Sequence, residues 1–290
     1  MKTYKIMEKK WLWFGISLAI IAVGLVNIFL YGLNWGIDFT GGNILHYNIH
    51  ESYNLQDVRD VMARFNLKDY DVKKAGDTGQ ELIIRTVLLT KEQQADITAA
   101  LKQKWTNLEL IRAEKVDAVI GKELQRQAII ALIIANIGML IYITFRFEFK
   151  SAVAAILALV HDVLMVISLY AILRIPVDST FIAVILTIVG YSINDTIVVF
   201  DRIRENLRFM RKTPFNDVAN LSIIQTIARS INTSLTTLIT IIALFLFGGE
   251  TIKDFTLALI VGIASGTYSS IFIASPLWAM WRQKPRAAKA

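Results

Sequence analysis

The sequence predicts an α-helical polytopic membrane protein with six transmembrane helices and a small α+β domain between the first two. Three observations predict this fold class. First, the 290 residues are 54% hydrophobic and only 19% charged, whereas soluble domains carry about 25% charged residues. Second, the apolar residues gather in six runs, each close to the roughly 20 residues that cross a bilayer. Third, one polar stretch, residues 43–118, has the patterning of alternating strands and helices.

The six apolar runs define the expected spans. They cover residues 11–31, 128–145, 152–173, 177–199, 229–247 and 255–278. The first run is too long for the apolar core of a secretory signal, and no small-x-small cleavage site follows it. We therefore expect an uncleaved transmembrane helix at residues 11–32 and five further helices within residues 128–278.

The distribution of basic residues predicts the topology. Lysines and arginines cluster in the N-terminus, between the second and third runs, between the fourth and fifth, and in the tail, whereas the opposite short loops hold only Arg174 and Lys253. By the positive-inside rule, residues 1–10, the basic loop 200–228 and the tail 279–290 are cytoplasmic, and residues 33–127 are extracytoplasmic. The net charge of +7 lies next to the spans, which favours a lipid bilayer over nucleic acid as its neighbour. We expect the bacterial cytoplasmic (inner) membrane.

The extracytoplasmic segment predicts a ferredoxin-like β-α-β-β-α-β domain. Strands are expected at 43–50, 70–74, 81–89 and 108–119, and a turn at 76–79. Helices are expected at 55–65, where apolar residues have helical spacing, and from the N-cap Thr90 to residue 105. A domain of this size has a modest core. We expect a module that contacts a partner or moves relative to the membrane part, without a pocket of its own chemistry.

Asp195 is the first candidate functional residue. A charge inside a span costs roughly 2.5–3.5 kcal/mol, so it normally faces protein or water. Tyr191 and Ser192 precede it by four and three residues, which places them on the same helix face, and Asn194 adds a further polar group. The alternative is an acid near the helix end that is merely interfacial.

Arg229 opens the fifth run and begins a polar stripe. At helical spacing the stripe continues through Asn232, Thr233, Thr236, Thr237 and Thr240. We expect it to face another span or a water-filled seam. In the alternative interpretation, Arg229 belongs to the cytoplasmic basic cluster and the threonine hydroxyls bond to their own backbone.

Asp162 and His161 lie near the middle of the third run. Consecutive helical residues point about 100° apart, so we expect only one of the two, Asp162, to face the bundle interior. Asp162 is either part of a proton path or a structural hydrogen-bond centre, and His161 is expected to be structural. In the sixth run, Gly262, Gly266 and Ser270 predict close helix packing.

The sequence does not favour an enzyme. No phosphate loop, zinc-protease motif or serine-hydrolase motif is present, and the chain has no cysteine for a thiolate metal site or a disulfide. We expect no metal site and no cofactor.

Three stretches resemble the SecF members of the SecD/SecF family of protein-export membrane proteins. They are GIDFTGG at 36–42, which includes Gly36, Asp38, Gly41 and Gly42, VGYSINDTIVVFDRIREN at 189–206, and ARSINTS at 228–234. The second is long and specific, and the overall plan of six spans with one outer domain extends the resemblance over the whole chain.

The resemblance implies a subunit of the Sec export machinery with an architecture similar to resistance-nodulation-division transporters. It implies a heterodimer with SecD that assists SecYEG in moving an unfolded exported polypeptide, driven by the proton motive force, with protons as the coupling ion. It also assigns the proton path to Asp195 and Arg229. Burial favours a neutral carboxylic acid and a nearby cation favours the carboxylate, so a pair that approaches and separates would release and take up a proton.

Two other functions stay open at this stage. One is a half-transporter for small molecules, which predicts an apolar substrate pocket in the outer domain. The other is a structural subunit that completes the bundle while SecD carries the proton path.

Overall fold

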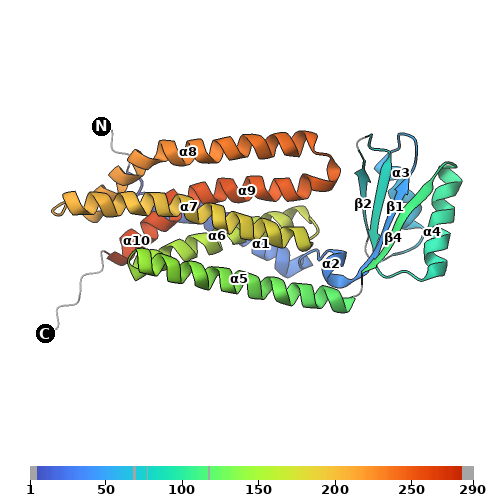
Figure 1. Cartoon of the computed structure of the whole chain (residues 1–290), viewed down its shortest axis with the longest axis horizontal. Coiled ribbons are helices and arrows are strands. Elements are labelled where there is room, and N and C mark those ends of the chain that lie inside the picture. Colours follow the sequence, from blue (N-terminus) through green and yellow to red (C-terminus); the bar gives the residue numbers. More distant parts are fainter. Residues whose placement is uncertain (1–4, 68–69, 77, 117, 283–290) are drawn as a thin grey trace.

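The structure is a computed structural model that describes residues 5–67, 70–76, 78–116 and 118–282. Some residues named in the sequence predictions lie outside this description: Lys2, Asp77 of the expected turn, and Lys284, Arg286 and Lys289 of the basic tail. Within the described residues, six helices are long and apolar enough to cross a membrane, which confirms the predicted number of spans. The chain forms a helical bundle with a sheet domain (Gly42–Val116) at one end (Figure 1).

The spans are continuous helices, and only the last changes its winding. The spans are α1 (Lys10–Tyr31), α5 (Ala118–Arg146), α6 (Phe149–Leu173), α7 (Ser179–Phe209), α8 (Phe215–Phe247) and a last span of α9 (Lys253–Ser269), one π-helical turn (Ser270–Ala274) and α10 (Ser275–Arg282). A short 3₁₀ turn, Glu250–Ile252, precedes α9. Pro276 lacks the N–H that an α-helix needs, so the π turn before it accommodates a changed hydrogen-bond register.

Three helices form the centre of the bundle and three its periphery. In the most apolar 18-residue stretch of each span, the share of buried residues is 50% in α6, 44% in α7 and 61% in the last span. The same share is 17% in α1, 6% in α5 and 11% in α8. The line of small residues in α9 explains the close packing. A Cβ on Gly262 would lie 2.1 Å from Ile188, and one on Gly266 would lie 2.8 Å from Ser192, both on α7. The predicted packing role of these glycines is confirmed.

Several element boundaries differ from the sequence expectation. The last strand ends at Val116, and α5 already begins at Ala118 instead of 128. Residues 200–209 extend α7 and residues 215–228 begin α8, so the expected loop 200–228 is reduced to 210–214 outside helices. The segments that extend α7 and α8 are rich in residues such as Ala, Glu, Gln, Arg and Leu, which favour helix. The two helices therefore continue past the apolar runs.

The sheet domain has the predicted element order. Its elements are β1 (Gly42–Asn48), α3 (Leu55–Ala63), β2 (Tyr70–Ala75), β3 (Glu81–Thr86), α4 (Lys91–Lys104) and β4 (Glu109–Val116). The strands are ordered β2-β3-β1-β4, and every neighbouring pair is antiparallel. Thr90 caps α4 through a capping box with Gln93, which confirms the predicted helix start.

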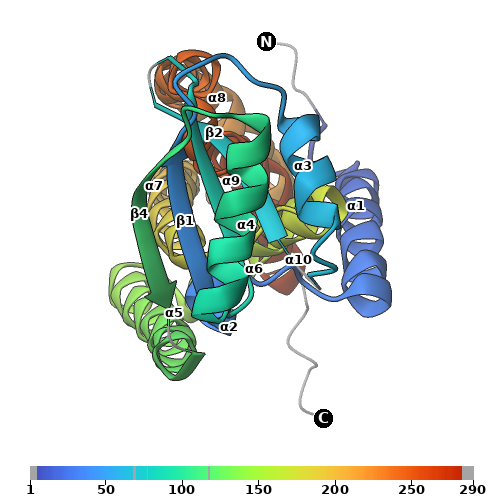
Figure 2. The same cartoon turned by 90° about the vertical axis from the view of Figure 1, so that its right-hand side faces the viewer.

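The two faces of the sheet have different neighbours. Alternate residues, among them Leu45, Tyr47, Leu82 and Ile84, are buried with Ile97 in a core beneath α3 and α4. Both helices cover the face directed away from the bundle (Figure 2). The other face carries Lys73 and Arg85 toward the helical bundle, where both meet acidic residues.

Candidate functional site

Asp195 is buried on α7 with an unsatisfied oxygen. The residue is 5% exposed, and its Oδ2 has no hydrogen-bond partner among the described residues. Ser230 of α8 is its buried neighbour, and Ser230 Oγ also lacks a partner. Arg229 precedes Ser230 in α8, but the described residues show no ion pair of 4.0 Å or less between Arg229 and Asp195. The site thus holds an acid, a hydroxyl and a cation that are close but not joined.

The other polar residues around Asp195 divide between two faces. Ser192 is buried, and Tyr191 donates to Thr233 O at 2.9 Å and to Thr237 Oγ1 at 3.2 Å, which links α7 to α8. Asn194 is exposed and makes no side-chain hydrogen bond with the residues described. The predicted polar patch is therefore divided, because Tyr191 faces α8, Ser192 bonds to Asp162 of α6 and Asn194 is exposed.

Arg229 lies at an open groove between α7 and α8. The groove has a volume of about 530 Å³ and is lined by Val198, Asp201, Arg202, Glu205, Gln225, Thr226 and Arg229. The walls of the groove are charged, and two of its lining residues, Val198 and Arg229, are near Asp195 and Ser230 in the chain.

The polar stripe of α8 faces outward. Arg229, Asn232, Thr233, Thr236 and Thr240 are all exposed, and the hydroxyls of Thr233, Thr236 and Thr240 bond to carbonyl oxygens of their own helix. Within the described residues, Tyr191 of α7 reaches the stripe at Thr233 and Thr237, and the expectation that the stripe faces another span or a water-filled seam stays a prediction. Backbone bonding lets threonines sit in an apolar environment, so one chain is sufficient to satisfy these hydroxyls.

Asp162 has the opposite environment, with every carboxylate oxygen bonded. It is fully buried in α6. Ser192 of α7 and Ser269 of α9 donate to its Oδ2 at 2.6 and 2.7 Å, and Ser265 donates to Oδ1 at 2.7 Å. His161 Nδ1 lies 3.0 Å from Oδ1. We call these five residues the Asp162 centre. It joins the three central helices.

His161 corrects one expectation. The residue is 7% exposed and its ring stacks on Tyr268 at 6.1 Å between centroids, so both His161 and Asp162 face the interior. The reason is that α6 packs against α1 on one side and against α7 and α9 on the other. A helix enclosed on several sides can bury residues that point 100° apart. His161 Nε2 has no partner among the described residues.

The sequence interpretation missed Ser265 and Ser269. They lie one turn apart on the face of α9 that also carries Gly262 and Gly266, and that face was interpreted as a packing surface only. A signal was present, since serine at this spacing in a span can satisfy an acid on a neighbouring helix.

The motif at 36–42 forms the junction between bundle and sheet domain. Gly36 N donates to Val177 O at 2.7 Å, and a Cβ on Gly36 would lie 2.9 Å from that oxygen. Asp38 Oδ2 accepts from Ser179 N at 2.9 Å and so binds the first turn of α7. Gly41 has φ +76°, and a Cβ on Gly42 would lie 2.2 Å from Thr86 O. Close backbone contacts therefore require glycine at 36 and 42, and the positive φ favours glycine at 41. Asp38 is required for its hydrogen bond to α7.

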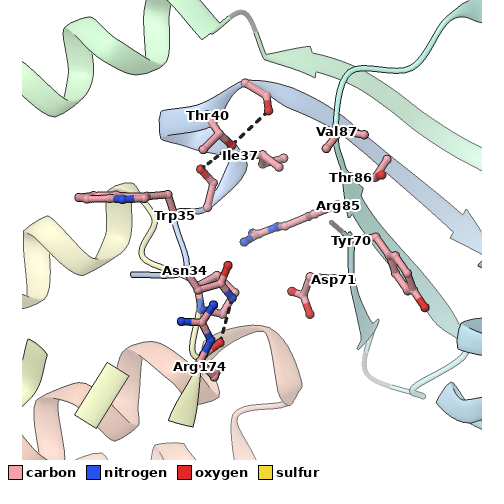
Figure 3. Close-up of a pocket in the computed structure, with 13 residues that line it drawn as sticks. Asn34, Trp35, Ile37, Thr40, Tyr70, Asp71, Arg85, Thr86, Val87 and Arg174 are labelled. Carbon is pink, nitrogen blue, oxygen red and sulfur yellow. Dashed lines mark hydrogen bonds between the residues drawn. The ribbon is translucent and has the colours of Figure 1, made fainter. Parts of the chain in front are cut away.

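A pocket of about 130 Å³ lies at this junction (Figure 3). Asn34, Trp35, Tyr70, Asp71, Arg85 and Arg174 are among its lining residues. Asp71 Oδ2 and Arg85 Nε are buried without hydrogen-bond partners among the described residues. Figure 3 shows Arg85 extending from the sheet toward the loop that carries Trp35 and Asn34. The pocket is shared by both parts of the chain.

Among the residues that the structure describes, two ion pairs cross the junction. Arg85 Nη1 of β3 lies 3.5 Å from Asp178 Oδ2, and Asp178 is also the N-cap of α7. Lys73 of β2 pairs with Asp254 in the first turn of α9. The sheet is therefore bound to the outer ends of the same two helices that bind Asp162.

Comparison with known proteins agrees with this architecture. Residues 96–284 match the family model "Protein export membrane protein SecD/SecF, C-terminal", and residues 26–45 match "SecD/SecF GG Motif". The chain is 42% identical to the protein translocase subunit SecF of Sebaldella termitidis, over 98% of this chain and 94% of the relative. It is 37% identical to SecDF of Bacillus subtilis, over 95% of this chain and 38% of that longer protein.

Solved structures of SecDF also match this chain. The crystal structure of SecDF from Thermus, titled a translocon-associated membrane protein, matches with a TM-score of 0.84 and 35% identity, covering 97% of this chain and 39% of that one. SecDF in a super-membrane-facing form matches over the same shares with a TM-score of 0.76 and 34% identity. The conformation of this chain is thus more similar to the former.

Proposed function

Because this chain belongs to the SecD/SecF family of protein-export membrane proteins, we propose that it works with SecD as a proton-driven subunit of the Sec translocation machinery. In this proposal it assists SecYEG in moving an unfolded polypeptide across the bacterial cytoplasmic membrane. The buried, unsatisfied carboxylate of Asp195 beside Arg229 carries the proposal. An acid without fixed partners can change its protonation state without breaking a hydrogen-bond network.

The proton cycle needs two arrangements of the Asp195 site. With Arg229 at a distance, burial favours the neutral acid, and with its guanidinium close, the carboxylate is favoured. The charged groove between α7 and α8 supplies access from one side of the membrane. Each unit charge that crosses 100 mV is worth about 2.3 kcal/mol, which is enough to bias a movement between states of similar energy.

Helix α7 supplies a mechanical connection to the sheet domain. It carries Asp195 near its centre, Ser192 of the Asp162 centre one turn earlier, and Asp178 at the junction. A tilt or shift of α7 would act on Arg85 and hence on β3. We interpret the sheet domain, with its β-α-β-β-α-β order, as a ferredoxin-like module that moves relative to the bundle and acts near the exported chain.

The outward stripe of α8 supports SecD as the covering partner. A row of Arg229, Asn232 and threonines facing lipid would be costly for the arginine, whereas a partner span could provide an acid or a water-filled seam. The name and the greater length of SecDF from Bacillus subtilis also support a pair in which SecD completes the bundle. With the start of α1 and the end of α10 at the bundle end opposite the sheet domain (Figure 1), the positive-inside rule supports a cytoplasmic location of that end.

The role of Asp162 is proposed from its hydrogen bonds. Four partners at 2.6–3.0 Å support a structural centre that holds α6, α7 and α9, in preference to a place in the proton path. The half-transporter function predicts an apolar substrate pocket in the outer domain. The pocket of about 500 Å³ in that domain has a volume in the range of ligand sites, but it is open to solvent and most of its lining is polar, including Asp57 and Lys74, so this function finds less support.

An export assay with Asp195→Asn tests the proposal. Membrane vesicles that contain this chain, SecD and SecYEG are supplied with ATP, with and without a proton gradient. We expect D195N to retain ATP-driven export and complex assembly but to lose the stimulation by the gradient. The control is Thr187→Val, which removes an exposed hydroxyl of α7 that bonds only to Ala183 O. Full gradient stimulation in D195N would contradict the proposal.

A further inference from the structure

The bundle end opposite the sheet domain carries a basic pocket that the proposed proton path does not use. It lies where the α5–α6 turn, the end of α7 and α10 come together (Figure 1). Its volume is about 280 Å³, and its lining includes Arg204, Arg208, Arg211, Arg282 and one acid, Glu148. The formal charge of these five residues is strongly positive.

The four arginines have unequal partners. Arg204 donates to Arg146 O at 2.7 Å, and Arg282 Nη1 lies 3.4 Å from Glu148 Oε1. Arg208 and Arg211 make no ion pair or hydrogen bond with any residue that the structure describes. Two guanidinium groups at the pocket are therefore available to an outside acceptor.

A buried donor is also left without an acceptor. Trp278 lines the pocket and is 2% exposed, and its indole Nε1 has no hydrogen-bond partner among the described residues. A buried unpaired N–H is rare in folded proteins and calls for an explanation such as a ligand or water. An acceptor bound in the pocket would satisfy it.

A simpler explanation accounts for part of this arrangement. Basic residues at the C-terminal ends of helices complement the helix dipole, and basic residues at this end of the bundle also set topology. Neither effect requires four arginines from α7, the turn after it and α10 to surround one pocket, nor an unpaired indole beside them.

The surroundings of the pocket are apolar and aromatic. Phe145, Phe149 and Phe209 are 90%, 63% and 81% exposed, and each lies within two residues of a pocket residue in the chain. Rings at helix ends of a membrane protein contact the boundary between headgroups and acyl chains. The pocket thus combines cationic groups for a headgroup with exposed rings for the adjoining hydrocarbon.

We propose that this pocket binds the phosphate of an anionic phospholipid in the adjacent leaflet. Arginine binds phosphate oxygens in a bidentate manner, and basic pockets between transmembrane helices at the cytoplasmic side bind anionic headgroups. The lipid would bridge α7 and α10 beside the groove that contains Arg229. The inference rests on this pocket alone and does not depend on a proton path.

Native mass spectrometry of the delipidated full-length chain with added phosphatidylglycerol tests the proposal. We expect R208Q/R211Q to weaken binding about thirtyfold, as the loss of two arginine contacts to anionic lipid implies. The matched control K9Q/K10Q removes the same charge from the same end of the bundle, outside the pocket, and should change affinity less than about threefold. Phosphatidylcholine should bind more weakly than phosphatidylglycerol.

A second variant and a competitor separate the alternatives. Trp278→Phe keeps all charges and the ring but removes the N–H, and we expect it to weaken phosphatidylglycerol binding several-fold. Glycerol phosphate, added as a soluble competitor, should not displace the lipid. Equal losses in the arginine variant and its control would overturn the proposal, as would displacement by glycerol phosphate, which would indicate a site for a free anion. Unchanged thermal unfolding of the variants establishes that the fold is intact.

Discussion

Asp162 and Asp195 are both buried carboxylates in the bundle, but they lie in regions with contrasting construction. The Asp162 centre is enclosed by α6, α7 and α9, and each of its oxygens accepts two hydrogen bonds or contacts. Asp195 faces α8 at the edge of a charged groove, and its Oδ2 accepts none. A buried polar group without partners costs free energy. The Asp195 arrangement therefore favours a change of protonation or of partners, whereas the Asp162 arrangement resists such a change.

The largest effect should come from deleting the Asp162 carboxylate. Asp162→Ala leaves Ser192, Ser265 and Ser269 without their common acceptor, and breaking a buried charged network costs about 3–5 kcal/mol. We expect a loss of this order in the free energy of unfolding, measured by titration with a denaturing detergent in mixed micelles. Asp162→Asn keeps the volume and can still pair with the hydroxyls, so it should lose clearly less. Equal stability of D162A and wild type would remove the structural role.

Substitutions at two glycines compare the tightly packed face of α7 with its open face. Gly262 of α9 is tightly packed against Ile188, whereas a Cβ on Gly190 of α7 meets nothing within 4 Å. Overpacking costs about 1–3 kcal/mol, so Gly262→Ala should destabilise the fold by that amount. Gly190→Ala should be neutral or stabilising, by up to about 1 kcal/mol. The same unfolding titration measures both, and a reversed order would mean that the central helices are not the tightly packed region.

The smallest effect is expected at the junction. The Lys73–Asp254 pair is partly exposed, and such pairs contribute about 0.2–1 kcal/mol. Lys73→Gln should therefore leave the fold intact but broaden the distances between sheet domain and bundle. Because the chain has no cysteine, spin labels at D96C and T251C report that distance directly. The charge-reversed pair K73D/D254K should restore a narrow distribution, and an unchanged distribution in K73Q would show that this pair does not hold the domain.

Hydrophobic pattern and residue spacing predicted much of this molecule because they act locally. The six spans, the strand and helix order of residues 42–116 and the capping box at Thr90 all follow from short-range signals. Helix ends were harder, since residues such as 118–127 are polar yet favour helix. The three serine partners of Asp162 lie 30 to 107 positions away in the sequence, and no local pattern specifies which serine faces which acid.

The outward direction of the Arg229 stripe illustrates a second limit. Spacing shows that six residues share one face, but not whether that face meets this chain or another. Likewise, the motif at residues 36–42 was identified by resemblance. Its physical basis is the contact of Gly36 with Val177 and of Gly42 with Thr86, and both partners are distant in the sequence.

Proton movement in proteoliposomes that contain this chain and SecD tests the contrast between the two acids most directly. A pH-sensitive dye inside the vesicles follows proton uptake under an imposed membrane potential, for the wild type, D195N and D162N side by side. We predict that D195N abolishes the uptake, whereas D162N, once shown to be folded, retains it within a few-fold. Undiminished uptake in D195N, or its loss in D162N alone, would contradict the assignment of proton exchange to Asp195.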